Sequence, residues 1–181
     1  MRLSKRQINS KSPDIDKIES LCNSSFSDSD AVSFRKLRRK AKKDNVAFEA
    51  YYIEGNFCAI SCIEFFEKFV YIHCISVYGR YRSKGIGSLI LSDIRRRAGD
   101  VPVFAEIERS NENGTENLKE LKILEFFAKN GFCDTGFSVG RRKNDFSLIS
   151  DSYGFTAEEI FEICNGYSSG FYKRKACTSA L

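Results

Sequence analysis

A glycine-containing segment between a predicted strand and a predicted helix carries the clearest chemistry: Val77-Tyr-Gly-Arg-Tyr-Arg-Ser-Lys-Gly-Ile-Gly-Ser88. Gly85 and Gly87 have no side chain, so the backbone there can turn tightly and approach a ligand closely. Successive amide N–H groups at the start of a helix bind anions, and the helix dipole favours negative charge there. Because Arg82 and Lys84 add positive charge, the segment predicts a pyrophosphate-binding site.

Two common phosphate-binding motifs do not fit this segment. The nucleotide-triphosphate loop needs Gly-x-x-x-x-Gly-Lys-Ser/Thr, but Ile86 follows Gly85. The dinucleotide fingerprint needs a third small residue after Gly-x-Gly-x-x, and Ile90 stands there. The pattern that remains is Arg-x-x-Gly-x-Gly, which has little specificity by itself.

Two neighbouring carboxylates suggest acid–base chemistry. Glu106 and Glu108 are two residues apart on the predicted strand 101–108, so both side chains lie on one face. A primary ammonium has a pKa of about 10, so a base must accept its proton before the amine can react. Two like charges this close raise the pKa of one carboxylate, which suits a general base. The alternative is a solvated strand face.

The elements that position these groups follow from hydrophobic periodicity and turn residues. The predicted strands are 2–8, 46–52, 57–66, 69–77, 101–108, 132–139 and 146–149. The predicted helices begin after Ser12-Pro13-Asp14, at about 31, at 89, at Leu118 and at Thr156, where Glu159 completes a capping box. Ile15, Ile18 and Leu21 mark the buried side of the first helix, and Leu118, Leu121 and Leu124 that of the fourth. An antiparallel meander followed by a β-α-β unit predicts an α/β fold with a mixed sheet and helices on its faces.

Composition excludes several other classes of protein. The chain has 181 residues, of which 42% are hydrophobic and 29% charged, and its 16 Phe and 8 Tyr can form a core, so extensive disorder is excluded. No apolar run reaches the roughly 20 residues of a membrane-spanning helix, and the N-terminus lacks a signal peptide's apolar stretch. We therefore expect a cytoplasmic protein without membrane association. We expect one domain over 1–150, with a helical tail over 151–181 that packs on it or extends it.

The cysteines and the single histidine predict no metal site. The seven cysteines have no Cys-x-x-Cys spacing, and His73 directly precedes Cys74, so on a strand these two side chains point to opposite faces. We expect reduced cysteines that pack as small hydrophobic residues.

A run of basic residues marks the predicted helix 31–43. Phe34, Leu37 and Ala41 recur at helical spacing, so the cations lie on the opposite face. These cations are Arg35, Lys36, Arg38, Arg39, Lys40, Lys42 and Lys43. We interpret them as a solvated basic face; attraction of a phosphate-rich ligand and nucleic-acid binding are the alternatives.

Two motifs together resemble the GCN5-related N-acetyltransferase (GNAT) superfamily. Arg82-x-x-Gly85-x-Gly87 after the strand resembles that superfamily's acyl-CoA-binding loop. Further along, Phe126-Phe127-Ala128-Lys129-Asn130-Gly131-Phe132 resembles its Phe-Tyr-x-x-x-Gly-Phe signature. The run Ala105-Glu-Ile-Glu108 resembles the Leu-Glu-Val-Glu of some members, and the element order matches over about residues 2–150.

The resemblance implies a mostly antiparallel mixed sheet that is splayed between its third and fourth core strands, where acetyl-CoA binds as cosubstrate. It implies an enzyme, an N-acetyltransferase that moves an acetyl group to a primary amine by direct transfer in a ternary complex. The matching cofactor-binding residues are Ile75, Ser76 and Val77 beside the pantetheine, Arg82, Ser83, Lys84, Gly85, Ile86, Gly87 and Ser88 around the pyrophosphate, and Phe127. The catalytic candidates are Glu106 and Glu108, and no metal is expected.

Several alternatives stay open at this point. His73 competes as the base, and Glu64 and Glu67 near a hairpin tip could bind a cationic acceptor. Phe127 stands where many members have a proton-donating tyrosine, so a water, Tyr153 or Tyr167 would have to supply the acid, if one is needed. A non-catalytic acyl-CoA-binding module and a nucleic-acid-binding protein are the other functions considered, although we expect no nucleic-acid partner. The acceptor could be a polyamine, an aminoglycoside, an amino acid or a protein N-terminus, and homodimer formation is left open.

Overall fold

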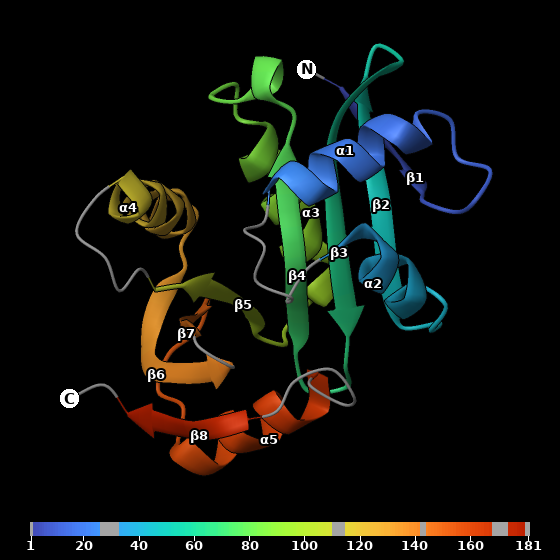
Figure 1. Ribbon diagram of the computed structural model, residues 1–181. Helices are drawn as coiled ribbons and strands as arrows, with labels where there is room; N and C mark the ends of the chain where they lie inside the picture. The colour runs from blue at the N-terminus through green and yellow to red at the C-terminus, as the bar shows by residue number, and fades with distance from the viewer. Residues whose placement is uncertain (1, 26–32, 110–114, 142–143, 168–173, 180–181) are drawn as a thin grey trace. The chain divides into compact units, whose positions relative to one another are not determined.

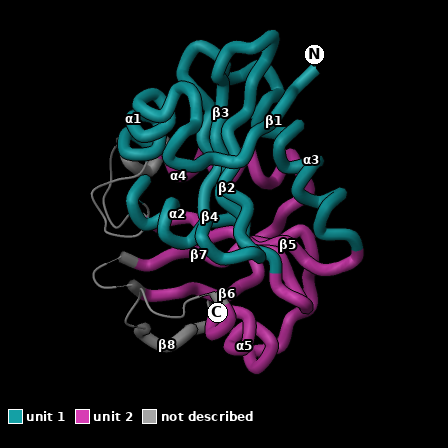
Figure 2. The backbone as a smooth tube through the Cα atoms, turned by 90° about the vertical axis from the view of Figure 1, so that its right-hand side faces the viewer, with its two compact units in different colours: residues 1–65, 72–99 teal, residues 66–71, 100–181 magenta. Residues whose placement is uncertain are grey.

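The computed structural model describes residues 2–25, 33–109, 115–141, 144–167 and 174–179 (Figure 1). The chain forms two compact units (Figure 2). The first consists of residues 1–65 and 72–99, and the second of residues 66–71 and 100–181. The division predicted at residue 150 stays a prediction.

The first unit has four neighbouring strands in the order β1-β2-β3-β4. They are β1 (Leu3–Gln7), β2 (Val46–Ile53), β3 (Asn56–Phe65) and β4 (Val70–Val77), of which residues 72–77 belong to this unit. The helices are α1 (Ile15–Ser25), α2 (Phe34–Lys40) and α3 (Ile86–Ala98), with a short 3-10 helix, η1 (Gly79–Tyr81). Helices α1 and α2 lie on one face of these strands and α3 on the other (Figures 1 and 2).

The core of the first unit lies between the strands and the first two helices. Ile18 and Leu21 of α1 are buried, as predicted, and Cys22 is buried beside them, whereas Ile15 is only partly buried. Phe34 and Leu37 of α2 join them, with Phe34 tilted against Phe48 at a ring-centroid distance of 6.2 Å. This packing holds α1 and α2 against the sheet.

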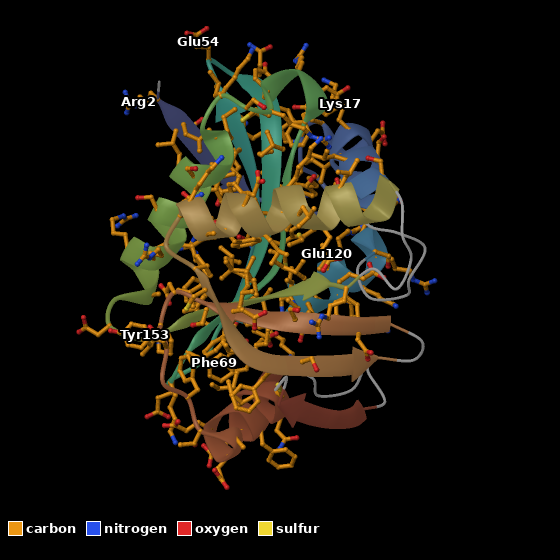
Figure 3. All side chains as sticks on the ribbon, turned by 90° about the vertical axis from the view of Figure 1, so that its left-hand side faces the viewer. Arg2, Lys17, Glu54, Phe69, Glu120 and Tyr153 are labelled. Carbon is orange, nitrogen blue, oxygen red and sulfur yellow. The ribbon has the colours of Figure 1, made fainter. Side chains whose placement is uncertain are left out.

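The second unit contains four antiparallel strands in the order β5-β7-β6-β8. They are β5 (Val103–Glu108), β6 (Cys133–Arg141), β7 (Asn144–Ser150) and β8 (Arg174–Ser179), accompanied by α4 (Thr115–Lys129) and α5 (Ala157–Tyr167). The core of this unit contains Phe69, Tyr71, Phe104, Leu148, Ile160 and Ile163. Phe69, labelled in Figure 3, stacks on Phe66 with 4.4 Å between the ring centroids.

The observed elements confirm the predicted α/β class, although several differ from the prediction. Helices α3 and α4 begin at Ile86 and Thr115, each three residues before the predicted start, and α2 ends at Lys40 rather than at 43. The tail predicted as helical contains α5 but also the strand β8. Leu118 and Leu121, expected on the buried side of α4, are 58% and 48% exposed. Residues 31 and 32 of the predicted basic helix lie outside the described residues. The predicted capping box is confirmed: the N–H of Thr156 donates to Glu159 Oε2, and the N–H of Glu159 donates to Thr156 Oγ1.

Candidate functional site

The segment between β4 and α3 contains two residues whose backbone has the left-handed conformation. The N–H of Tyr78 donates to the carbonyl of Cys58 at 2.8 Å, which ties the segment to β3. After η1, Ser83 has a φ of 59° and Gly85 a φ of 77°, and Gly85 is the N-cap of α3. Positive φ on either side of Lys84 turns successive N–H groups toward one concave side, the arrangement of an anion-binding nest.

The first turn of α3 adds unused amide donors to this nest. The first bond of the helix runs from the N–H of Leu89 to the carbonyl of Gly85 at 3.0 Å. The N–H groups of residues 86–88 therefore have no acceptor within the helix. The first turn of α3 contains no acidic residue, so no carboxylate there neutralises the positive end of the helix dipole. Arg95, Arg96 and Arg97 lie in the last turn, at the opposite end of the helix.

The space around Gly85 is open enough for an anion. A Cβ added at Gly85 would meet no atom within 4 Å. The exposed Arg82 side chain donates from Nε to the carbonyl of Val77 at 3.0 Å, which holds its guanidinium at the end of β4. The predicted residues 82–88 thus form one cradle whose donors fit a pyrophosphate.

The predicted pantetheine strand leads into this cradle. Ile75 and Val77 of β4 are half-buried and alternate with Ser76, which is buried. Ser76 Oγ lies 2.5 Å from Ser25 Oγ at the end of α1, so its side chain is engaged inside the first unit. Contact between these residues and a pantetheine chain would therefore use the backbone of Ser76, and that contact stays a prediction.

The two candidate carboxylates belong to the second unit. In the sheet, Glu106 pairs with Leu148 of β7 and Glu108 with Phe146. Both glutamates are half-buried and alternate along β5 with the buried residues Ala105 and Ile107. The alternation confirms that they share one face of β5. Glu106 Oε2 is closed to solvent. Their role as general bases stays a prediction.

Phe127 lies in the last turn of α4. Its ring makes edge contacts with those of Phe126 and Phe132, each at a centroid distance of 5.2 Å. The N–H of Phe132 donates to the carbonyl of Phe127 at 3.1 Å, and Gly131 has a φ of 82°. The glycine-containing signature therefore forms a helix C-terminal cap, since a left-handed glycine is typical there. Contact between Phe127 and a cofactor stays a prediction.

Glu64 is not available to a cationic acceptor, which corrects one alternative from the sequence. It is fully buried, and its oxygens lie 2.8 Å from Lys40 Nζ, 2.9 Å from Lys43 Nζ and 2.8 Å from His73 Nε2. Burial raises the pKa of Glu64, but the hydrogen bonds from His73, Lys40 and Lys43 outweigh burial and hold that pKa at about 2. The cluster binds α2 to β3 and β4 within the first unit.

The same cluster corrects the interpretation of the basic helix. Lys40 is buried, and Lys43, although exposed, forms an ion pair with Glu64. The solvated basic face therefore does not include all seven cations. Arg35, Arg38, Arg39 and Lys42 are exposed, as predicted. Sequence reasoning missed this cluster. Its signal was a glutamate inside the apolar run Ile60-Ser-Cys-Ile-Glu-Phe65, where a charge needs a buried partner.

The remaining candidates are exposed or lie outside the described part. Glu67 is exposed in the hairpin turn, and Tyr153, labelled in Figure 3, is 90% exposed. The side chain of Tyr167 lies outside the described residues. In the described ranges, no three His, Cys, Asp or Glu side chains gather in a way that could hold a metal ion. None of the helices in those ranges is long and apolar enough to cross a membrane.

Comparison with known proteins gives a likeness of structure rather than of sequence. No protein-family model and no curated protein matches the chain. A GNAT-family protein from Bacteroides thetaiotaomicron matches with a TM-score of 0.65 and 17% identity, over 90% of this chain and 94% of that one. Arabidopsis thaliana Naa50, solved with the bisubstrate analogue CoA-Ac-MVNAL, matches with a TM-score of 0.56 and 17% identity, over 83% and 98%.

A third structure contains the expected cosubstrate. A GNAT-family acetyltransferase from Elizabethkingia anophelis with acetyl-CoA bound matches with a TM-score of 0.59 and 12% identity, over 82% of this chain and 96% of that one. At such identities the likeness establishes the fold. The chain has the fold of GNAT acetyltransferases, which confirms the fold that the sequence motifs predicted.

Proposed function

We propose that this protein is an acetyl-CoA-dependent N-acetyltransferase that moves an acetyl group to a primary amine by direct transfer in a ternary complex. The observation that carries the proposal is the cradle of residues 82–88. It combines two left-handed residues, the unused N–H groups of the first turn of α3 and open space at Gly85. The GNAT fold and the binding of acetyl-CoA and a CoA analogue by proteins that share it support the same cosubstrate.

The roles of the chain's own residues follow from their chemistry. The cradle amides and Arg82 would hold the pyrophosphate, and the backbone of Ile75–Val77 would pair with the pantetheine chain. Glu106 or Glu108 would accept the proton of the ammonium, directly or through a water, so that the amine can attack the thioester carbonyl. The attack forms the C–N bond of the amide and breaks the thioester C–S bond, and the proton that the nitrogen loses passes to the released CoA thiolate or to water. Phe127 cannot protonate this leaving group, but a thiol with a pKa of roughly 8.5 leaves readily without a strong acid.

Calorimetry with acetyl-CoA tests the cradle. Gly87→Val places a branched side chain where the backbone must approach the pyrophosphate, so we expect acetyl-CoA affinity to fall at least tenfold. Ser92→Val introduces the same residue at an exposed position of the same helix and serves as the matched control. If acetyl-CoA binds the wild type and Gly87→Val equally well, the cradle is not the pyrophosphate site.

A thiol-release assay with a panel of amines tests the activity. The panel contains polyamines, aminoglycosides, free amino acids and peptides with a free N-terminus. Thioester turnover with any of these acceptors supports the transferase. Phe127 favours a second candidate, a non-catalytic acyl-CoA-binding module, which predicts acetyl-CoA binding without thiol release for every acceptor. Tight DNA or RNA binding at physiological salt that acetyl-CoA does not change would instead favour nucleic-acid binding through the exposed cations of α2.

The cellular setting is part of the same proposal. Six cysteines are free thiols in the described part of the chain, and this state fits the reducing cytoplasm that we expect. We propose no metal in the reaction, because the chemistry assigned to Glu106 and Glu108 needs none.

A further inference from the structure

Three exposed cations lie in the cradle or directly before it. Arg80, Arg82 and Lys84 occupy alternate positions along residues 80–84, and all three side chains are exposed. In the ranges that the structure describes, none of them forms an ion pair with an Asp or Glu. Such a concentration of positive charge attracts a multiply charged anion.

Two of these cations are held against one aromatic ring. Arg80 Cζ lies 4.9 Å from the centroid of the Tyr81 ring, and Lys84 Nζ lies 5.6 Å from the same centroid. Arg80 Cζ is also 5.7 Å from the Tyr78 ring centroid. Cation–π attraction holds both charges near Tyr81 although they repel each other, so an anion bound between them would relieve the repulsion.

One more cation of the first unit lies near the cluster. Lys17 of α1 is close enough for its charge and that of Arg80 to repel, but Asp14 pairs with Lys17 at 2.6 Å and compensates its charge.

Arg82 is set apart from Arg80 and Lys84 because its Nε is bound to the carbonyl of Val77. The backbone N–H groups of the cradle, that of Lys84 included, and the Arg82 side chain already supply the donors that a pyrophosphate needs. The side chains of Arg80, Tyr81 and Lys84 are therefore left for a second anionic group.

We infer that the Arg80–Tyr81–Lys84 cluster binds the 3′-phosphate of coenzyme A and makes the protein select CoA thioesters over dephospho-CoA thioesters. The inference rests on the proposed function. In coenzyme A a single ribose separates the 3′-phosphate from the pyrophosphate, so the site for one must adjoin the site for the other. A phosphate monoester carries a charge of about −1.5 to −2 near neutral pH, which matches two cations held on one ring.

Calorimetry with two ligands tests this inference. We expect acetyl-CoA to bind the wild type at least about tenfold more tightly than acetyl-dephospho-CoA, the scale of one charge-assisted hydrogen bond. The Arg80→Gln variant should lose most of this preference while its affinity for acetyl-dephospho-CoA stays unchanged, because Arg80 lies outside the cradle of residues 82–88. Lys42→Gln, which removes an exposed cation from α2, is the control and should keep the full preference.

The possible outcomes separate this inference from the proposed function. If the wild type binds the two ligands equally well, the 3′-phosphate is not recognised and the inference is wrong, although the proposed function stands. If Arg80→Gln weakens both ligands equally, the cluster binds the pyrophosphate instead, which also overturns the inference. If the wild type binds neither ligand, both proposals fail.

Discussion

Lys40 Nζ lies 2.8 Å from Glu64 Oε2, and both side chains are buried. The contact joins the last residue of α2 to β3, so it fixes the C-terminal end of the basic helix on the sheet. A buried carboxylate is costly unless cations and hydrogen-bond donors compensate for lost hydration. Lys43 and His73 complete that compensation.

Removal of the Lys40 side chain should therefore destabilise the protein far more than removal of the exposed Lys42 side chain. We expect Lys40→Ala to lower the free energy of unfolding by about 3 kcal/mol, because it takes a cation from a buried carboxylate. Lys42→Ala, at an exposed position, should change it by no more than about 0.5 kcal/mol. Urea unfolding measures both, and equal effects of the two substitutions would show that the buried pair contributes nothing.

Acid stability should depend on the ionisation of Glu64. The pKa of Glu64 is about 2 in the folded protein, against 4.5 as the ordinary value. Ionised Glu64 therefore stabilises the fold fully above pH 4.5, and this contribution disappears as the pH falls toward 2. The linked free energy is about 3 kcal/mol.

Unfolding measured across the acid range tests this linkage. Glu64→Gln should lower stability at neutral pH and remove most of the decline between pH 4.5 and about 2. Glu67→Gln alters an exposed carboxylate of the nearby turn and should leave the decline intact. A Glu64→Gln variant that still loses stability as steeply as the wild type would assign acid sensitivity to other groups.

Gly166 should resist the substitution that normally strengthens a helix. Alanine is favoured over glycine by about 1 kcal/mol in a helix interior and by less at Gly166, the second-last residue of α5. Here an added Cβ would lie 2.9 Å from Phe69 Cζ, and Phe69 is confined by stacking on Phe66 and by an edge contact with Phe104. We expect Gly166→Ala to destabilise the protein by about 1–3 kcal/mol, the usual cost of overpacking.

Thermal unfolding of a second variant separates overpacking from a helix effect. Phe69→Leu removes the ring that the new Cβ would meet, so Gly166→Ala should cost much less in that background. Glu162→Ala, at an exposed position of the same helix, is the control and should have little effect, since its ion pair with Lys68 is exposed. If Gly166→Ala raises the melting temperature of the wild type, the helix propensity of alanine governs the site rather than the contact with Phe69.

Local patterns predicted most elements, whereas contacts distant in sequence could not be predicted. The buried side of α1 with Ile18 and Leu21 and the Thr156 capping box depend on neighbouring residues, and both were found. The Lys40–Glu64 pair joins residues 24 apart, and its existence depends on how α2 lies on the sheet. The positive φ of Ser83 could not be predicted from the sequence, because serine rarely adopts this conformation.

Thiol reactivity should distinguish one cysteine from the other described ones. Cys133 is exposed, whereas Cys22, Cys58, Cys62, Cys74 and Cys164 are buried. Burial raises the pKa of Cys22 to about 12 and that of Cys58 to about 11, so the reactive thiolate is scarce at both. In a Cys177→Ser background, we expect one thiol to react quickly with a disulfide reagent at neutral pH, and Cys133→Ser should remove it. Two or more fast thiols would contradict the buried positions.

Catalysis should depend on the β5 carboxylates more than on His73. Glu106→Gln or Glu108→Gln should lower the turnover number about 10²-fold, the scale for loss of a general base, and should flatten the acid limb of the pH–rate profile. Acetyl-CoA affinity should survive, since the cradle of residues 82–88 is unchanged. His73 is bound to buried Glu64, so we expect His73→Gln to reduce stability while turnover of the folded enzyme changes little. Turnover that falls with His73→Gln and not with either glutamate variant would move the base from β5 to β4.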